Sequence, residues 1–513
     1  MTSANICILV TIVIYLGVMV TVGAVFSKKN KSTDDFYLGG RKLGPFVTAM
    51  SAEASDMSGW LLMGLPAVAL MTGLPEAVWT AVGLAIGTYI NWLLVAKPLR
   101  IYSEKVKAVT IPEFFSKRFG DNKNILTCIA AIVIVVFFVP YTASGFAACG
   151  KLFGSIFGAD YLMAMVLSAI VITVYCTLGG FLAASTTDFI QSIVMTVALF
   201  VVVGFGEGLC GGFDSVFANV QSLDGYLDLF KGFDVATGEV MSYGALPVIS
   251  TLAWGLGYFG MPHILLRFMA IESPKKLKTS RRIASVWVVI SMAVAVLIGV
   301  IGYSLMKNGI VGPYDSASAA ETIIVDISKV LSKYGYVPAV VAGVILSGIL
   351  ASTMSTADSQ LLAAASSITQ DLSQTTFKIK VSKTASVWFA RIAVVVIAAV
   401  AVFIARDPNS SVFEIVSFAW AGFGAAFGPV VLCALFWKRA NKYGAIAGMI
   451  TGGAMVFFWK FVIRKFFAGT VLDIYELLPA FVLALVVIIV VSLLTKAPDK
   501  QIVKVFDSVK KQK

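Results

Sequence analysis

The sequence predicts an all-α protein that crosses a membrane many times. Of its 513 residues, 58% are hydrophobic and 13% are charged, whereas a soluble domain carries about 25% charged residues. The hydrophobic residues gather into runs near the length of about 20 residues that a membrane-spanning helix needs. The Lys and Arg residues concentrate in alternate loops between these runs. We therefore expect no nucleic-acid partner, despite the formal net charge of +12.

Thirteen hydrophobic segments are candidate spans, and the first is not a cleavable signal peptide. No charged residue precedes it and Lys28, Lys29 and Lys31 follow it, which reverses the charge order of a signal peptide. We expect an anchor helix instead. The thirteen segments cover residues 5–27, 46–73, 77–96, 125–153, 161–181, 186–206, 245–270, 283–306, 337–366, 387–405, 412–437, 444–463 and 477–495.

The charge distribution predicts the orientation of these segments. When Arg267 and Arg391 at helix ends are included, 31 of the 40 Lys and Arg residues fall on one side of the membrane. The positive-inside rule places that side in the cytoplasm. The N-terminus is then outside, and the basic tail 496–513 lies in the cytoplasm near anionic lipid. Of the two long external loops, the second contains an expected surface helix at 317–331.

The chain offers few groups for covalent chemistry. Its six cysteines are scattered without a CxxC pair, and it has a single histidine, His263. This pattern argues against a disulfide framework and a zinc site. We therefore do not expect an enzyme.

Ionisable residues inside a hydrophobic span are costly and usually functional. The segment 51–60 contains Glu53 and Asp56, followed by Ser58 and Gly59. Small residues, Gly and nearby Pro66 predict an interrupted helix whose freed carbonyl groups line a cavity or hold an ion. A patch of small residues for helix packing is the alternative, but it does not explain two carboxylates.

A second segment, 252–263, also predicts a broken helix. Three glycines and Pro262 fall within it, and Trp254, Tyr258 and Pro262 recur at a spacing of four, so they share one helical face. An aromatic stripe of this kind is commonly core packing. The adjacent glycines favour a binding surface.

A third cluster offers neutral oxygen ligands. Ser352 lies one turn before Ser355 and Thr356, and hard cations prefer oxygen. The alternative is that these hydroxyls bond to the preceding helical turn. A fourth candidate, Asp188, lies near a cytoplasmic helix end, where an interfacial cap and a role in ion release are both open.

Four stretches resemble the sodium/solute symporter family, and within it the bacterial proline branch. The resemblance covers about residues 5 to 495, and the run Ser55-Asp-Met-Ser-Gly-Trp60 is characteristic of that branch. The stretches are Asp35-Phe-Tyr-Leu-Gly-Gly-Arg41, Ala54-Ser-Asp-Met-Ser-Gly-Trp-Leu-Leu-Met-Gly-Leu-Pro66, Gly255-Leu-Gly-Tyr-Phe-Gly-Met-Pro-His263 and Phe418-Ala-Trp-Ala-Gly-Phe-Gly-Ala-Ala-Phe-Gly-Pro429.

The resemblance implies a leucine-transporter-like fold in one transmembrane domain of thirteen helices. It implies an additional N-terminal helix at 5–27, two inverted five-helix repeats at 46–206 and 245–437, and two C-terminal helices within 444–495. It further implies uptake of L-proline driven by Na+ across the bacterial cytoplasmic membrane. Symport of a sugar, pantothenate or sialic acid remains the alternative, with a channel or sensor as a more distant one.

The resemblance also assigns site residues by position. The sodium ligands it implies are the carbonyl groups of Ala54, Met57 and Ser352 and the hydroxyls of Ser355 and Thr356. It implies proline contacts at Tyr141, Trp254, Tyr258 and Pro262, and at Ser58 and Gly59. The aromatic rings of Tyr141, Trp254 and Tyr258 suit both the proline ring and its ammonium group. Asp56 would tune the ion site, and Arg41 and Asp188 would lie on the inward ion path.

Overall fold

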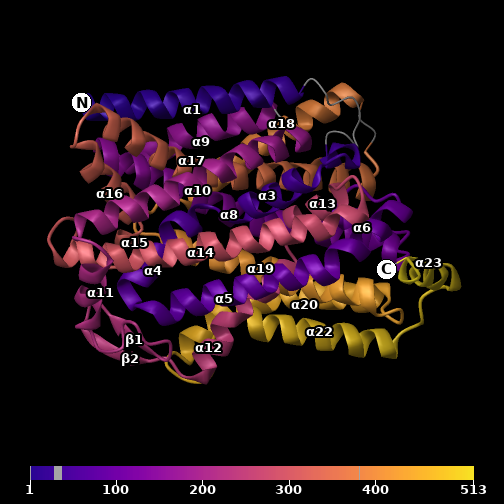
Figure 1. The fold of residues 1–513 in the computed structure, drawn as a ribbon. Helices are drawn as coiled ribbons and strands as arrows, with labels where there is room; N and C mark the ends of the chain where they lie inside the picture. The colour runs from indigo at the N-terminus through magenta and orange to yellow at the C-terminus, as the bar shows by residue number, and fades with distance from the viewer. Residues whose placement is uncertain (1, 28–36, 179, 380–381, 513) are drawn as a thin grey trace.

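The computed structural model describes residues 2–27, 37–178, 180–379 and 382–512, and its long helices run side by side (Figure 1). Within these residues nine helices are long and apolar enough to cross a membrane, and a bent pair makes a tenth. Three shorter apolar helices, Tyr161–Thr177, Ala245–Phe259 and Trp388–Ile404, match the remaining predicted segments. Each of the thirteen predicted ranges therefore has a helical counterpart.

The first half of the chain holds the first broken span. The helices are α1 (Ser3–Ser27), α3 (Pro45–Asp56), η2 (Trp60–Gly64), α4 (Leu65–Thr72), α5 (Leu74–Ile90), η3 (Asn91–Val95), α6 (Ala96–Lys105), α7 (Ile111–Phe119), α8 (Ile125–Phe157), α9 (Tyr161–Leu178) and α10 (Phe181–Leu209). The pair Pro45–Asp56 and Trp60–Thr72 is bent by 61°, so the predicted interruption near Asp56 is confirmed.

The second half holds the second broken span, which continues from α12 through η4 to α13. The helices are α12 (Ala245–Leu252), η4 (Ala253–Phe259), α13 (Pro262–Ala270), α14 (Leu277–Lys307), α17 (Tyr336–Ser366), η6 (Ser367–Thr376), α18 (Lys383–Ile404), α19 (Val412–Phe436), α20 (Lys442–Phe458), η7 (Trp459–Ile463), α21 (Arg464–Phe466) and α22 (Leu477–Leu494). A 3₁₀ segment, η4, and the non-helical Met261 interrupt the span, as the glycines predicted.

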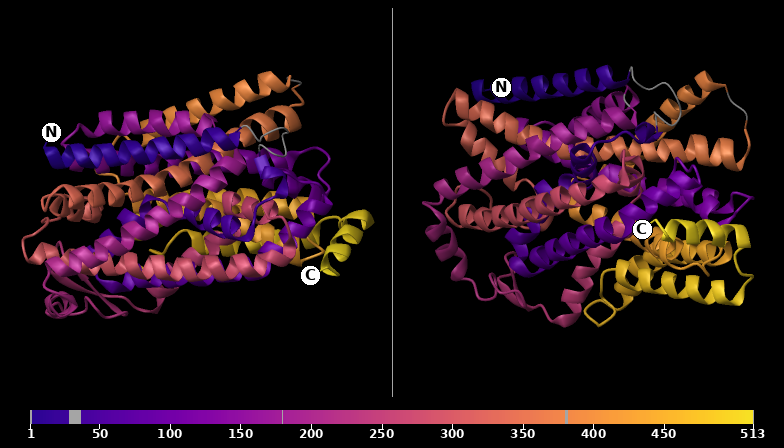
Figure 2. Two further views of the ribbon diagram at one scale, coloured as in Figure 1. Left: turned by 45° about the horizontal axis from the view of Figure 1, so that its top comes forward. Right: turned by 45° about the vertical axis from the view of Figure 1, so that its right-hand side comes forward.

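The two termini lie at opposite ends of the bundle (Figure 1). Helix α1 runs along one edge of the bundle, and the C-terminal pair α20 and α22 lies at another (Figure 2). A chain that ends opposite to where it begins crosses an odd number of times, which agrees with the thirteen predicted segments.

Short elements cover the end of the bundle where the chain begins. They are α11 (Phe213–Gln221), the antiparallel hairpin β1 (Lys231–Asp234) and β2 (Glu239–Ser242), α15 (Ala317–Ala320) and α16 (Ile323–Ser332). The expectation of a surface helix at 317–331 is wrong. Ile323, Ile324, Val325 and Ile327 are all 0% exposed, because this segment packs into the bundle rather than on it.

The opposite end carries η1 (Gly39–Arg41), α6, α7, η5 (Pro274–Lys276) and α23 (Lys500–Lys510). Asp35 and Phe36 of the first family-like stretch lie outside the described residues. The predicted cytoplasmic tail forms the helix α23, which buries Phe506 beneath the Arg118 guanidinium of α7, 4.9 Å from the ring centroid. The tail is therefore partly docked on the bundle.

Candidate functional site

The break in the first core helix brings several polar groups together. Helix α3 ends at Asp56, and Met57 leaves helical geometry with φ −76° and ψ 71°. The Asp56 carbonyl oxygen then accepts hydrogen bonds from the Trp60 indole at 3.0 Å and the Tyr141 hydroxyl at 3.1 Å. Because a helix interior would have used this carbonyl group itself, the break is what makes it available to side chains.

The predicted sodium ligands converge from two helices. The Ser355 hydroxyl on α17 donates to the Ala54 carbonyl oxygen on α3 at 2.7 Å. The Thr356 hydroxyl donates to the Ser352 carbonyl oxygen at 3.0 Å. Met57 is 0% exposed and directly follows α3. The structure therefore places the five residues at one junction of α3 and α17, and their role as ligands stays a prediction.

Aromatic side chains surround the same break. The Tyr258 hydroxyl on η4 donates to Asp56 Oδ2 at 2.6 Å, so both predicted tyrosines reach Asp56. The ring centroid of Trp254 lies 6.3 Å from that of Trp60 and 6.3 Å from that of Trp420. The two broken spans thus meet through aromatic contacts next to the carboxylate.

Helix α5 supports the second broken span from behind. A Cβ atom added at Gly87 would lie 2.3 Å from the Gly255 carbonyl oxygen, so only glycine permits this approach. The amide of Asn91 donates to the Tyr258 carbonyl oxygen at 2.9 Å. These contacts hold η4 in its irregular conformation.

Three of the predicted substrate residues occupy different surroundings. Ser58 is 1% exposed, and its hydroxyl makes no hydrogen bond with the described part of the chain. Gly59 packs on α8, where a Cβ atom would lie 3.0 Å from Ala148. Pro262 begins α13 and lines a cavity described below. Ser58 therefore has free hydrogen-bonding capacity beside Asp56, whereas Gly59 permits close helix packing.

Asp188 forms a buried ion pair that the sequence did not predict. Its Oδ2 atom accepts from the Arg267 guanidinium at 3.0 Å and from the Ser51 hydroxyl at 2.7 Å. Arg267 also donates to the Ser359 hydroxyl at 2.6 Å. We had counted Arg267 among the charges that face the cytoplasmic loops, but its side chain is 2% exposed. One feature of the sequence could have indicated this buried pair: Arg267 is a basic residue within an apolar run, one helical turn after His263.

Arg41 has contacts of another kind. Its guanidinium donates to the carbonyl oxygens of Met269 at 2.6 Å and Ala108 at 2.7 Å, and to the Ser103 hydroxyl at 3.1 Å. These bonds connect the segment that precedes α3 with the end of α13, with α6 and with the loop after α6. Asp188 therefore pairs with Arg267 rather than with Arg41.

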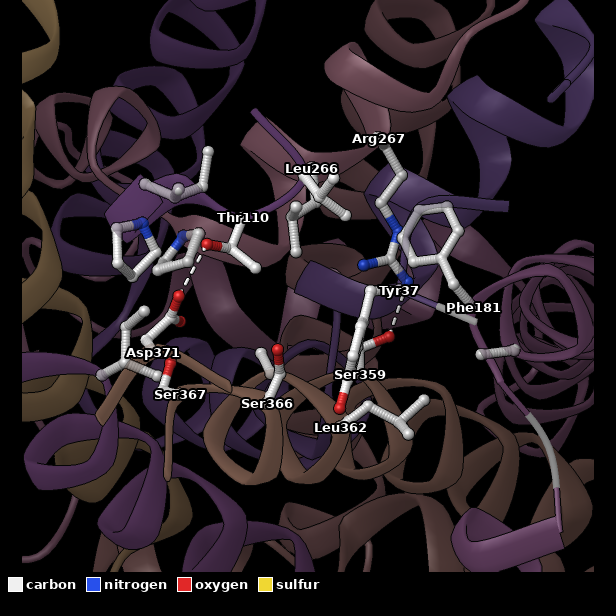
Figure 3. A pocket seen from close by; sticks show the side chains of 17 residues that line it. Tyr37, Thr110, Phe181, Leu266, Arg267, Ser359, Leu362, Ser366, Ser367 and Asp371 are labelled. Carbon is white, nitrogen blue, oxygen red and sulfur yellow. Dashed lines mark hydrogen bonds between the residues drawn. The ribbon is translucent and has the colours of Figure 1, made fainter. Parts of the chain in front are cut away.

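A small cavity of about 40 Å³ lies next to the broken helices, at the end of the bundle that carries α7. Arg267 and Ser359 lie at one side of it, and Thr110 and Asp371 at the other, where the Thr110 hydroxyl donates to Asp371 at 2.9 Å (Figure 3). Pro262 and Ile134 also line it. The cavity thus reaches the start of α13, immediately after η4, from this end.

The other end of the site is closed. Lys151 on α8 and Glu321, between α15 and α16, form an ion pair at 2.5 Å with side chains 7% and 1% exposed. Glu321 also accepts from the Ser411 hydroxyl at 2.9 Å and the Phe413 amide at 3.2 Å. This cluster and the buried α16 cover the broken helices on the side of the N-terminus.

The comparisons with known proteins identify the family. The model of the Sodium:solute symporter family matches residues 36–452, and the chain belongs to this family. It is a membrane transporter, and the class expected from the four stretches is confirmed.

Several curated relatives match nearly the whole chain. The osmoregulated proline transporter OpuE of Bacillus subtilis is 42% identical over 506 residues, 98% of each chain. The sodium/proline symporter of Haemophilus influenzae is 43% identical over 514 residues, 98% of this chain and 97% of the relative. The sodium/proline symporter of Escherichia coli is 41% identical over 502 residues, 97% of this chain and 95% of the relative.

Solved structures confirm the leucine-transporter-like fold. A Na+-coupled sialic acid symporter in a substrate-bound outward-open state superposes with a TM-score of 0.78 at 18% identity, over 96% of this chain and 99% of that one. MhsT in complex with L-phenylalanine superposes with a TM-score of 0.52 at 12% identity, over 88% and 97% of the chains.

Proposed function

We propose that this protein imports L-proline together with sodium across the bacterial cytoplasmic membrane. The observation that carries the proposal is the junction at Asp56, where Tyr141 and Tyr258 reach the break in α3 while Ser355 contacts Ala54 on the same helix. A sodium ion held between α3 and α17 would fix the shape of the break. Proline bound beside the break would then depend on sodium.

The roles of the residues follow from this arrangement. Ala54, Met57, Ser352, Ser355 and Thr356 would supply oxygen ligands to sodium. Tyr141, Trp254 and Tyr258 would enclose the proline ring and face its ammonium group, and Ser58 would bond the substrate. Pro262 would lie at the cytoplasmic end of the pocket. The Asp188–Arg267 pair would lie on the way out for the ion.

The proposed transport cycle is alternating access. Residues 46–206 and 245–437 would form two inverted repeats, each opening with a broken span, as in many transporters of this type. The N-terminus would lie outside and the C-terminus in the cytoplasm, since the basic loops gather at the C-terminal end. Sodium and proline would raise each other's affinity, because such coupling is reciprocal.

Sodium supplies the driving force for accumulation. One charge that crosses about 100 mV yields roughly 2.3 kcal/mol, and a tenfold sodium gradient adds about 1.4 kcal/mol. Even a single sodium ion per substrate would therefore sustain accumulation of roughly a few hundredfold. The chain would act by binding and moving its substrates, without covalent chemistry.

Uptake by proteoliposomes tests the proposal. We expect an inward sodium gradient to drive accumulation of labelled L-proline, and unlabelled proline to compete. The panel of competitors should include a sugar, pantothenate and sialic acid, since other family members provide the rival substrates. Strong inhibition by one of these with none by L-proline would refute proline as the substrate.

A further inference from the structure

A second group of oxygen atoms lies on the other side of Asp56, away from Ser355. Glu53 precedes Asp56 by three residues, so both carboxylates lie on one face of α3. Glu53 Oε1 accepts from the Trp92 indole of η3 at 2.9 Å, and Asp56 Oδ2 accepts from Tyr258. The two carboxylates therefore face η3 and η4, whereas Ala54 faces α17.

The other oxygens of this group lack hydrogen-bond partners. Within the described residues, Glu53 Oε2, Asp56 Oδ1, Asn91 Oδ1 and Thr88 Oγ1 accept no hydrogen bond. Their residues are 1%, 0%, 0% and 0% exposed, respectively. Asn91 is adjacent to Trp92, which bonds Glu53, and its amide bonds Tyr258, which bonds Asp56. Thr88 lies one turn before Asn91 on the same helical face.

The charge of this group has no protein counterpart. Neither Glu53 nor Asp56 forms an ion pair in the part of the chain that the structure describes; the buried pairs there are Lys151–Glu321 and Arg267–Asp188. Two buried carboxylates without a cation are strongly unfavourable in an apolar interior. The predicted sodium site has only neutral ligands, so when both carboxylates are ionised, one sodium there balances only one of their two charges.

We propose that Glu53, Asp56, Asn91 and Thr88 bind a second sodium ion during transport. This inference rests on the proposed sodium-coupled uptake of proline. A hard cation uses several oxygens at once, and four oxygens without partners meet that need. Two sodium ions, one on each side of Asp56, balance the two carboxylates. Glu53 is then a ligand specific to the second site, and transport moves two sodium ions per proline.

The null point of flux in proteoliposomes measures this ratio. The membrane potential is clamped at zero and sodium is tenfold higher outside. Net proline flux then vanishes at a tenfold inside-to-outside proline ratio for one sodium, and at about a hundredfold ratio for two. We expect about a hundredfold ratio for the natural protein and about a tenfold ratio for Glu53→Gln. Glu414→Gln, on an exposed residue at the start of α19, serves as the control and should keep the hundredfold ratio.

A milder pair of variants covers the case in which Glu53→Gln does not fold. Thr88→Val and Thr80→Val each remove a fully buried hydroxyl without a partner from α5 and keep the side-chain shape. We expect Thr88→Val to raise the sodium concentration for half-maximal uptake at least threefold, and Thr80→Val to leave it unchanged. An equal response of the two variants would overturn the assignment of Thr88.

The remaining outcomes also decide the matter. Sodium-driven proline flux with a tenfold null point in the natural protein would overturn the second site while leaving the proposed function intact. A null point that moves with luminal pH would assign the group to a proton instead and overturn the sodium proposal. A null point at a hundredfold proline ratio in Glu53→Gln would show that Glu53 is not a ligand of the second sodium ion. Absence of any sodium-driven proline flux would refute the proposed function itself.

Discussion

The two ends of the transport path are closed in different ways. On the N-terminal side, α16 buries five aliphatic residues and Glu321 pairs with Lys151 above the broken helices. On the C-terminal side a small cavity of about 40 Å³ reaches Pro262, and polar contacts such as Thr110–Asp371 and Arg267–Ser359 border it. Opening the first end must expose the aliphatic side chains of α16, whereas opening the second must also separate polar contacts, including the buried Arg267–Asp188 ion pair. Packed aliphatic side chains and a buried ion pair thus cover the site toward the N-terminal face, whereas a small, partly polar cavity reaches it from the other face.

The largest effect is expected at the buried Arg267–Asp188 ion pair on the C-terminal side. Arg267→Met leaves Asp188 buried without its cation, with the Ser51 hydroxyl still bonded to it, and breaking such an ion pair costs about 3–5 kcal/mol. We expect a clear loss of thermal stability in detergent, measured by the midpoint of unfolding. The double variant Arg267→Met with Asp188→Asn removes the stranded charge and should recover part of the loss. Equal midpoints of unfolding for the single and double variants would show that the stranded charge of Asp188 does not cause the loss of stability.

The next effect concerns the sealed end. Glu321→Gln weakens the bond to Lys151, which keeps its hydrogen bonds to Ser318 at 3.0 Å and 2.7 Å, so we expect a cost of about 1–3 kcal/mol. The closed arrangement should then be less populated. The test uses a protein that retains Cys149, which is 0% exposed, as its single cysteine. A membrane-impermeant maleimide should label Cys149 several times faster when this protein also carries Glu321→Gln than when it keeps Glu321.

The control for the sealed end is Asp315→Asn, which changes an exposed carboxylate in the same segment. It should leave the labelling rate of Cys149 unchanged. If Cys149 is labelled at the same rate in Glu321→Gln and in Asp315→Asn, the Lys151–Glu321 ion pair does not hold this end closed.

The smallest effect is expected at the polar edge of the cavity. Thr110→Val removes the hydrogen bond to Asp371 and also the N-cap of α7, where the Thr110 hydroxyl accepts from the Glu113 amide, and each interaction is worth about 1 kcal/mol. We expect the cavity to widen slightly, so that a cysteine introduced at Ser366 is labelled a few times faster by a thiol reagent supplied from the C-terminal side. Thr177→Val, at an exposed hydroxyl, is the control. A slower rate in Thr110→Val would contradict the proposed contribution of this contact.

Much of the fold could be predicted from the sequence because a bilayer constrains it strongly. Runs of apolar residues must become helices in lipid, so the span limits needed only hydropathy. The break near Asp56 could be predicted because carboxylates and small residues interrupt an otherwise apolar run. The family resemblance assigned Tyr141 and Tyr258 to the proline site. Their hydrogen bonds to Asp56, 85 and 202 positions away, are seen only in the structure.

Contacts that depend on tertiary structure could not be predicted. Helix α16 has Asp326 and Lys329 among aliphatic residues, which is the pattern of a surface helix, yet neighbouring helices surround its apolar residues. Arg267 near a helix end resembled a loop charge, although Asp188, 79 positions away, is its partner. In both cases the sequence supplies the residue type, and the packing of distant helices decides its environment.

The dependence of proline binding on sodium tests the central claim most directly. The affinity of purified protein for labelled proline is measured with and without saturating sodium, for the natural protein and for Ser355→Ala with Thr356→Ala. Coupling between sites is typically 5- to 150-fold, so we expect sodium to tighten proline binding at least tenfold in the natural protein. In the double variant the two affinities should differ by less than about twofold. Equal tightening by sodium in both proteins would contradict a sodium site between α3 and α17.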